Sequence, residues 1–297
     1  MRFDSSSLTP LGRSLRRFAL ALFAVLIAAC STFKVGYNNA DLFLVHALDR
    51  YVSLTSEQEK LVRQRMASVM EWHRATQLRD YSAFIHRARA ELDGNVSPAE
   101  VIEFSEGVNA RLLALGERIA PDFAALALTL SRGQIDQLER KLSDDDAKAR
   151  RETAEEMKKA VDARARKYAE RAEFWLGKLN PQQLEIVRAS LAGRPADSMY
   201  WIDARERRNK ALVALLRRIQ AERPPTEAAA GWIRAYFAEL AQPSDAKLRA
   251  RAEAFRRDNA RLIAQLVNSA TPEQQAHLDQ RLDTFAAEFG HLANRGG

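Results

Sequence analysis

Five helix starts share one sequence pattern, and this pattern constrains the fold of the 297-residue chain more than any other feature. In each start, a side chain that caps helices stands three residues before a Glu or a Gln. The capping oxygen accepts a hydrogen bond from a free backbone N–H of the first turn, and the Glu or Gln side chain accepts one from the N–H of the capping residue. A helix is therefore expected to begin at each pair: Thr55 with Gln58, Ser97 with Glu100, Ser131 with Gln134, Asn180 with Gln183, and Thr271 with Gln274.

Apolar residues recur three and four positions apart along most of the chain, which is the spacing of one helix face. Leu278, Leu282, Phe285, Phe289 and Leu292 form one such stripe. A narrow stripe on an otherwise charged helix packs one face on a core and leaves the rest in water. The sequence therefore predicts an all-α fold, an elongated multi-helix bundle of antiparallel amphipathic helices.

The helix starts and the apolar stripes together predict ten helices. Their expected ranges are 37–52, 56–92, 98–129, 132–142, 145–178, 181–192, 202–221, 227–240, 245–268 and 272–293. The firmest breaks between helices are Gly193-Arg194-Pro195 and Arg223-Pro224-Pro225. We expect an N-terminal lobe at residues 30–193 and a C-terminal lobe at residues 194–297, or one continuous domain formed by both.

The N-terminal 29 residues have the character of an export signal. Arg13, Arg16 and Arg17 precede twelve apolar residues at 18–29, and this run is too short for a membrane span of about 20 residues. Small residues then lead to Cys30, the single cysteine of the chain. The alternative is an ordinary secretory signal that happens to contain a cysteine.

The sequence Ile27-Ala28-Ala29-Cys30 resembles the lipobox of bacterial lipoproteins. The resemblance implies that residues 1–29 are a lipoprotein signal peptide, cleaved between Ala29 and Cys30. It also implies that Cys30 carries diacylglycerol and acyl groups such as palmitate. Several acyl chains on one residue anchor a protein stably in a membrane.

The location implied by this resemblance is the periplasmic face of the outer membrane. Ser31 follows the cysteine, whereas aspartate at this position favours retention in the inner membrane. Removal of residues 1–29 lowers the net charge from +7 to +4, because this segment holds four arginines and one aspartate. A mildly basic protein in this compartment is not expected to bind nucleic acid.

Four helix starts share a longer element that resembles the repeated signature of periplasmic chaperones of the Spy and CpxP type. Residues 54–58 match Leu-Thr-x-x-Gln, and residues 130–134, 179–183 and 270–274 are near matches. The simpler interpretation is recurrent helix capping, with an apolar residue before each cap that packs as a hydrophobic staple.

A second resemblance covers residues 30–58. Tyr37-Asn38-Asn39-Ala40-Asp41, Leu48-Asp49-Arg50-Tyr51-Val52 and the Leu54 element are similar to a family of helical bacterial lipoproteins that is classified as a domain of unknown function. The resemblance implies a location and a fold, and it assigns no activity and no catalytic residue.

The sequence contains no pattern of an enzyme or of a metal or cofactor site. Its histidines, His46, His73, His86, His277 and His291, do not form the pairs that place two zinc ligands on one helix face. We expect Asp144-Asp145-Asp146 to cap a helix that begins near residue 145, where acids complement the helix dipole, rather than to bind a cation. A phosphate-binding glycine loop and a nucleophile elbow are both missing from the sequence. The sequence predicts neither catalysis nor a cofactor.

Positive charge is concentrated in one segment. Residues 30–193 carry 25 basic and 25 acidic side chains, whereas residues 194–261 carry 15 basic and 9 acidic ones. Arginine donates two parallel hydrogen bonds and therefore suits phosphate groups. The simpler interpretation of this charge is a solvated helix face, and the alternative is a surface for an anionic partner at Arg205, Arg207, Arg208, Lys210, Arg256 and Arg257. The adjacent Met199-Tyr200-Trp201 is either an exposed anchor or a staple that holds the next helix to the core.

Together these features predict a lipid-anchored, periplasm-facing protein without enzymatic activity. Its expected partner is another envelope protein, which it binds as an adaptor or in a chaperone-like manner. The alternative is a structural or assembly factor that contacts anionic lipid or lipopolysaccharide through the arginine-rich lobe. The oligomeric state is left open.

Overall fold

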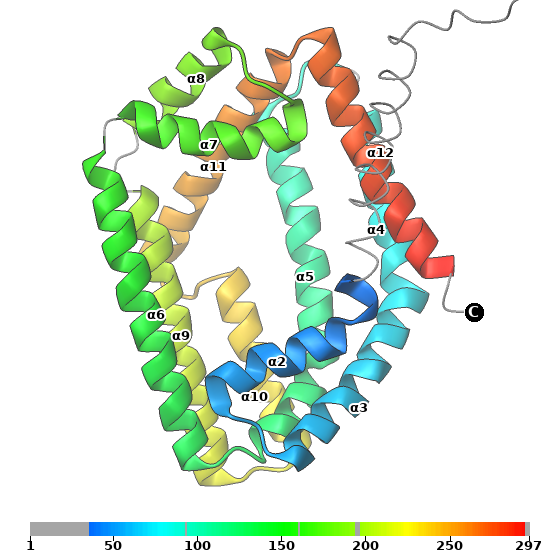
Figure 1. Ribbon diagram of the computed structural model, residues 1–297, viewed down its shortest axis with the longest axis vertical. Coiled ribbons are helices and arrows are strands. Elements are labelled where there is room, and N and C mark those ends of the chain that lie inside the picture. Colours follow the sequence, from blue (N-terminus) through cyan, green and yellow to red (C-terminus); the bar gives the residue numbers. More distant parts are fainter. Residues whose placement is uncertain (1–35, 93, 160, 194–196, 295–297) are drawn as a thin grey trace, which may run out of the picture. The chain divides into compact units, whose positions relative to one another are not determined.

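The computed structural model describes residues 36–92, 94–159, 161–193 and 197–294, and the regular elements of these residues are helices (Figure 1). The chain divides into two compact units, residues 1–44 and 45–297. The predicted all-α fold of antiparallel helices is confirmed, and the described residues contain no strand. The elements are α2 (Ala40–Val52), α3 (Ser56–Trp72), the π-helical turn η1 (His73–Gln77), α4 (Leu78–Ala90), α5 (Pro98–Ala127), α6 (Arg132–Lys158), α7 (Val161–Leu176), α8 (Pro181–Ala192), α9 (Asp197–Glu222), α10 (Thr226–Ala241), α11 (Ala246–Asn268) and α12 (Pro272–Asn294).

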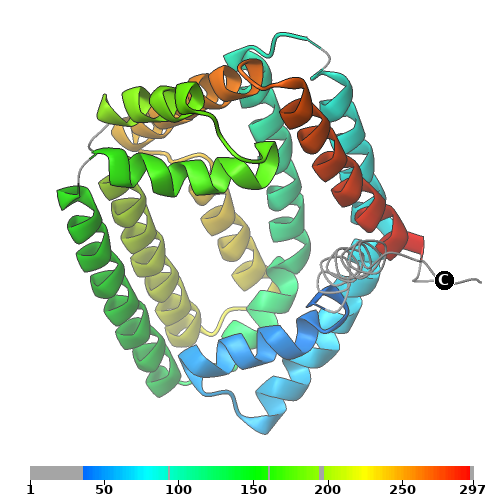
Figure 2. The same cartoon turned by 45° about the horizontal axis from the view of Figure 1, so that its top comes forward.

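Within residues 45–297 the helices pack mainly in pairs. The closest pairs are α4 with α12, α5 with α10, α6 with α9, and α7 with α8, and they lie side by side in both views (Figures 1 and 2). Further contacts form a closed circuit that runs from α3 to α5, α11, α8, α7, α12 and α4, and returns through η1 to α3. Helix α5 is central to this arrangement, because it contacts α3, α9, α10 and α11.

All five predicted capping boxes are present. In the boxes at Thr55, Ser97, Ser131 and Asn180, the cap accepts from the third residue of the helix, and that residue accepts from the N–H of the cap. The fifth box has the same two bonds between Thr271 and Gln274, at 3.0 and 3.3 Å. The sequence did not single out the cap of α11, which is the Asp245 side chain.

The structure corrects two predicted helices. Residues 132–142 and 145–178 were expected as separate helices, but α6 runs without a break from Arg132 to Lys158. The break comes after Lys158, where Lys159 has an extended backbone, and α7 begins at Val161. The interpretation of Asp144, Asp145 and Asp146 as the start of a helix is therefore wrong, because these residues lie inside α6.

The range 56–92 was predicted as one helix, and it contains a π-helical turn. The N–H of Leu78 donates to the carbonyl of His73, five residues earlier. One extra residue in a turn shifts the helix face that follows, and such insertions are frequent at functional sites. The His73 ring packs against Tyr81 with centroids 5.3 Å apart, and Tyr81 packs against Phe289 of α12 at 5.6 Å. Burial holds the pKa of His73 below its usual value, with a smaller contribution from Arg74.

Two hydrophobic clusters form the core. The first joins α2, α5, α6, α9 and α10, and α5 contributes the small residues Ala120, Ala124 and Ala127 to it. The second joins α7, α8 and α11. Both clusters therefore combine residues from before and after Gly193. The apolar residues before four of the caps pack as staples, with Leu54 and Leu130 in the first cluster and Leu179 and Ala270 in the second.

Four of the capping glutamines form two reciprocal pairs, and the first pair joins the starts of α3 and α6. Gln58 and Gln134 exchange hydrogen bonds through their side-chain amides, with N–O distances of 3.2 and 2.7 Å. Each glutamine also donates to a backbone carbonyl before the other helix. Gln58 donates to Thr129 and Gln134 donates to Ser53, both at 3.1 Å.

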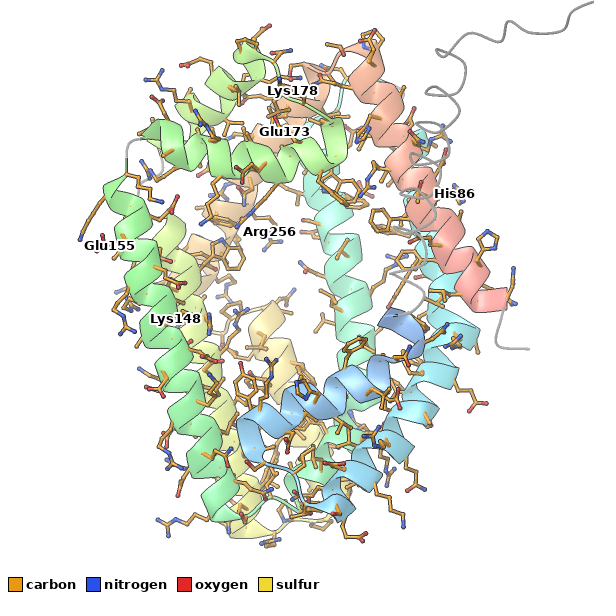
Figure 3. The ribbon with its side chains drawn as sticks, in the orientation of Figure 1. His86, Lys148, Glu155, Glu173, Lys178 and Arg256 are labelled. Atoms are coloured by element: carbon orange, nitrogen blue, oxygen red, sulfur yellow. The ribbon has the colours of Figure 1, made fainter. Side chains whose placement is uncertain are left out.

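The second pair repeats this arrangement at the starts of α8 and α12. The amides of Gln183 and Gln274 exchange hydrogen bonds at 2.8 and 3.0 Å. Gln183 donates to the carbonyl of Ser269 at 3.1 Å, and Gln274 donates to that of Lys178 at 2.8 Å; Lys178 is labelled in Figure 3. In both pairs, the accepting carbonyl stands five positions before the partner glutamine.

The chemistry of these pairs requires glutamine. The amide oxygen accepts from the N–H of its own cap and from the partner amide, while the nitrogen donates to the partner oxygen and to the loop carbonyl. All hydrogen-bonding groups of the side chain are therefore used. A glutamate completes a capping box equally well, but its carboxylate has no donor for the second half of the arrangement. The box with a glutamate, Ser97 with Glu100, is exposed and forms no such pair.

We predict that Gln183→Glu lowers the free energy of unfolding by about 3 kcal/mol. Gln183 is fully buried, and the substitution places a carboxylate oxygen beside two acceptors, the Ser269 carbonyl and the Gln274 amide oxygen, where the amide nitrogen donated before. Urea unfolding followed by circular dichroism measures the loss. Acidification restores part of it, because a protonated carboxyl regains one donor and burial raises the pKa of that carboxyl.

The control is Glu100→Gln, which makes the reverse exchange of carboxylate and amide in the exposed capping box that has no partner glutamine. We expect a loss below about 1 kcal/mol there, from the weaker interaction with the helix dipole. Equal losses in the two variants would show that the glutamine pairs contribute nothing beyond capping.

Candidate functional site

The predicted lipidation and cleavage sites, Cys30 and Ala29, lie outside the residues that the structure describes. They therefore remain predictions from the sequence. Among the described helices, no segment is both long enough and apolar enough to cross a membrane.

The six residues of the predicted cationic surface lie on α9 and α11, and they differ in what they contact. Arg205 bonds to Asp146 at 2.9 Å, and Arg256 bonds to Glu106 of α5 at 3.1 Å. Figure 3 shows Arg256 extending from α11 toward α5. The remaining four form no ion pair with any described residue, and they are the exposed side chains Arg207, Arg208, Lys210 and Arg257.

Asp146 holds the Arg205 guanidinium in an ion pair. Its carboxylate is buried between α6 and α9, where it also accepts two hydrogen bonds from the Asn209 amide at 2.9 Å. The neighbouring Asp145 bonds to Lys141, which lowers the pKa of its carboxyl, and it accepts a hydrogen bond from Tyr51 at 3.0 Å. Two members of the aspartate run therefore fix α6 to its neighbours.

The histidines do not converge. His46 lies on α2, His73 in η1, His86 on α4, and His277 and His291 on α12. No group of three potential ligands that would hold a metal ion occurs among the described residues. His86 is labelled in Figure 3.

Two aromatic residues next to the predicted cationic surface, Tyr200 and Trp201, combine the two predicted roles of staple and exposed anchor. Tyr200 is buried and stacks on Phe255 of α11, with ring centroids 5.6 Å apart. Trp201 contacts the same ring edge-on at 5.0 Å, yet half of its surface is exposed. The pair thus attaches α9 to α11 and leaves one indole partly in solvent.

An apolar groove of about 630 Å³ lies within residues 88–282. This volume falls in the range of about 300–1,000 Å³ that is usual for ligand sites. Its walls come from α5, α7, α11 and α12 and from the segment that follows α4. The main apolar lining residues are Leu92, Val96, Val101, Phe104, Val108, Trp175, Leu176, Ile263, Leu266, Leu278 and Leu282.

Aromatic packing holds the α5 wall of the groove in place. Phe104 stacks on Phe84 of α4, with centroids 4.9 Å apart, and the guanidinium of Arg111 lies over the Phe84 ring at 3.8 Å. Gly107 makes this possible, since a Cβ at that position would lie 2.5 Å from the Phe84 ring. Although it is packed on Phe84, Phe104 remains more than one-third exposed at the groove.

On the α7 wall, Trp175 is held by rings from α7 and α12. It contacts Phe174 edge-on at 5.1 Å and Phe285 of α12 at 5.5 Å. Arg281 covers the Phe174 ring at 3.8 Å. The indole of Trp175 is thereby fixed, although 39% of the residue surface remains exposed.

The groove contains few polar groups. Glu100 lines it, but its carboxylate accepts from the N–H of Ser97 at 2.6 Å, and hydrogen bonds from Ser97 hold its pKa below the usual value. Arg171 and Asn109 are exposed lining residues. A smaller polar pocket adjoins the groove, because Leu92, Val267 and Leu278 line both; Asn95, Gln275 and Asp279 belong to the polar one.

An exposed apolar stripe extends the groove along α5. Phe104, Val108 and Leu112 follow one another at four-residue intervals and therefore lie on one side of the helix. Leu112 lies beyond the groove lining and is 61% exposed. The stripe extends over about 12 Å at 1.5 Å per residue.

The sequence analysis did not identify this groove. Apolar stripes indicate which face of a helix avoids water, but they do not indicate which helices meet there. One signal was present, because Phe104, Val108 and Leu112 lie at four-residue intervals and so continue an apolar face along the N-terminal half of α5.

Comparison with known proteins identifies one relationship. Residues 50–225 match the model of a family of unknown function, DUF6279. No curated protein and no solved structure matches the chain.

Proposed function

The chain belongs to DUF6279, a family of unknown function, and we propose that it is a non-enzymatic binding protein of the cell envelope that holds an apolar segment of a partner protein. The observation that carries this proposal is the apolar groove between α5, α7, α11 and α12. Fixed, partly exposed aromatic side chains in a concave apolar site are typical of binding surfaces.

The shape of the apolar surface favours a polypeptide segment. The exposed side chains Phe104, Val108 and Leu112 form a stripe of about two helical turns along α5, in which Phe104 and Val108 line the groove and Leu112 continues it by one turn. A partner helix places apolar side chains on one face with the same spacing, as in other helix-in-groove interfaces. The binding of apolar segments that are not yet folded is the chaperone-like form of this activity.

The lipobox resemblance supplies the second part of the proposal. Acyl groups on Cys30 would anchor the chain to the periplasmic face of the outer membrane. The anchor raises the local concentration of the groove near envelope proteins, so a weak interaction with a single segment becomes sufficient.

The first test concerns the anchor. We predict that Cys30→Ser abolishes labelling by a radioactive fatty acid and moves the protein from the membrane fraction to the periplasmic extract. The thiol is the acceptor of the first lipid group, and serine does not replace it. Fractionation and labelling of cells that produce either form measure both effects.

The matched control is Ser31→Thr, which leaves the cysteine in place and keeps the label and the location. Continued labelling of the Cys30→Ser form would contradict lipidation at this residue.

The second test concerns the groove. We expect the form that begins at Ser31, which contains the whole compact unit of residues 45–297, to suppress the aggregation of a chemically denatured client protein. Val108→Glu together with Leu112→Glu should weaken this activity at least about tenfold, because each places a charge where an apolar group must be buried. Light scattering during dilution of the client from denaturant measures the activity.

Leu184→Glu together with Leu240→Glu is the matched control, since these leucines are also exposed but lie on α8 and α10 and do not line the groove. Thermal unfolding of each variant verifies that the fold is retained. Equal loss in both double variants, or no activity in the parent form, would overturn the proposed function.

A second candidate function is contact with anionic lipid. Arg207, Arg208 and Lys210 lie within four residues on α9, and they form no ion pair with described residues. Cationic side chains near an anionic membrane contribute about 1 kcal/mol each. The anchor would keep this surface close to lipid phosphate groups.

For this candidate we predict salt-sensitive binding to vesicles that contain an anionic phospholipid. Substitution of Arg207, Arg208 and Lys210 by serine should reduce it at least about tenfold. The control removes three exposed cations from α6 by Arg132→Ser, Arg140→Ser and Arg151→Ser, which changes the net charge equally. Cosedimentation measures binding, and equal reduction in both triple variants would reject a defined lipid surface on α9.

A further inference from the structure

Arg171 is the single cation among the side chains that line the apolar groove. It lies on α7 between Tyr168 and Trp175, which also line the groove and stand one helical turn away on either side. It is exposed and forms no ion pair with any described residue. The groove therefore combines an extensive apolar wall with one available positive charge.

The positions around Arg171 explain why it has no local partner. Ion pairs within a helix form between residues three or four apart. The residues at those distances are Lys167, Tyr168, Phe174 and Trp175, and none of them is an acid.

The acids of the groove are not partners for Arg171 either. The Glu100 carboxylate is part of the cap of α5 and accepts a hydrogen bond from the Ser97 N–H at 2.6 Å, while the Glu100 N–H donates to the Ser97 hydroxyl. Glu91 directly follows α4; its side chain is exposed and forms no ion pair with a described residue. The Asn109 amide is an additional polar group on the α5 wall.

We propose that the groove binds a long-chain fatty acid anion, with the hydrocarbon chain between α5, α7 and α11 and the carboxylate at Arg171. The guanidinium presents a planar pair of donors that matches a carboxylate, and one cation balances one negative charge. A phosphate monoester carries about two charges and would leave one of them without a partner. The inference depends on the groove being open to apolar ligands, as the proposed function requires, and it names a small-molecule ligand of the same site.

The test compares three ligands of equal chain length: dodecanoate, dodecanol and dodecyltrimethylammonium. Isothermal titration of the form that begins at Ser31 should show one dodecanoate bound per chain and much weaker binding of the other two. Arg171→Gln should weaken dodecanoate at least about tenfold and leave dodecanol unchanged, because the substitution removes a charge-assisted hydrogen bond and keeps the apolar wall.

Two variants control for the location of the site. Arg166→Gln removes an exposed cation from the same helix outside the groove lining and should leave all three affinities unchanged. Val108→Glu obstructs the groove wall and should abolish the binding of dodecanoate. Retention of dodecanoate affinity in Arg171→Gln, or in Val108→Glu, would overturn the assignment.

The outcomes separate this inference from the proposed function. If the parent form suppresses client aggregation through Val108 and Leu112 but binds dodecanoate no better than dodecanol, the fatty acid assignment is wrong and the protein-binding groove stands. If it binds dodecanoate through Arg171 but does not act on the client, the ligand site is correct and the polypeptide function is rejected.

Discussion

The reciprocal hydrogen bonding of capping glutamines is the interaction on which the rest of the fold depends. A capping box by itself stabilises only the start of its own helix, because it satisfies free backbone amides of that helix. When the glutamine of that box also bonds to the glutamine and the loop carbonyl of another box, two helix starts distant in sequence are fixed to each other. Each pair lies beside one of the two core clusters, where the preceding apolar residues pack as staples.

This arrangement leaves part of the apolar surface uncovered. Helix α5 buries the small residues of its C-terminal half, including Ala120 and Ala124, in the first cluster. Its N-terminal half is covered only in part, and Val108 and Leu112 remain exposed. On the other side, Leu176 and Leu266 belong to the second cluster and also line the groove. The groove thus lies where the surface of the second core meets the partly uncovered half of α5.

The sequence predicted what depends on neighbouring residues and missed what depends on distant ones. All five capping boxes were identified because their hydrogen bonds join residues three apart. The aspartates at 144–146 were misjudged, because tertiary partners such as Arg205, Asn209 and Tyr51 make these acids suitable in the middle of α6. The repeated glutamines were interpreted as caps alone, because the partner of each glutamine lies far away in the sequence and is not encoded locally. The groove was not predictable for the same reason, because it requires knowing which helices lie side by side.

The central claim is that the groove beside α5 receives an apolar segment of an envelope protein, and site-specific photocrosslinking in cells tests it most directly. A photoreactive amino acid at position 108 in the full-length protein, followed by mass spectrometry of the crosslinked peptides, identifies what occupies the groove. The account predicts crosslinks that map to apolar segments of envelope proteins and that disappear when the photoreactive residue is moved to position 184 on α8. The same products from both positions, or no product from position 108, would contradict it.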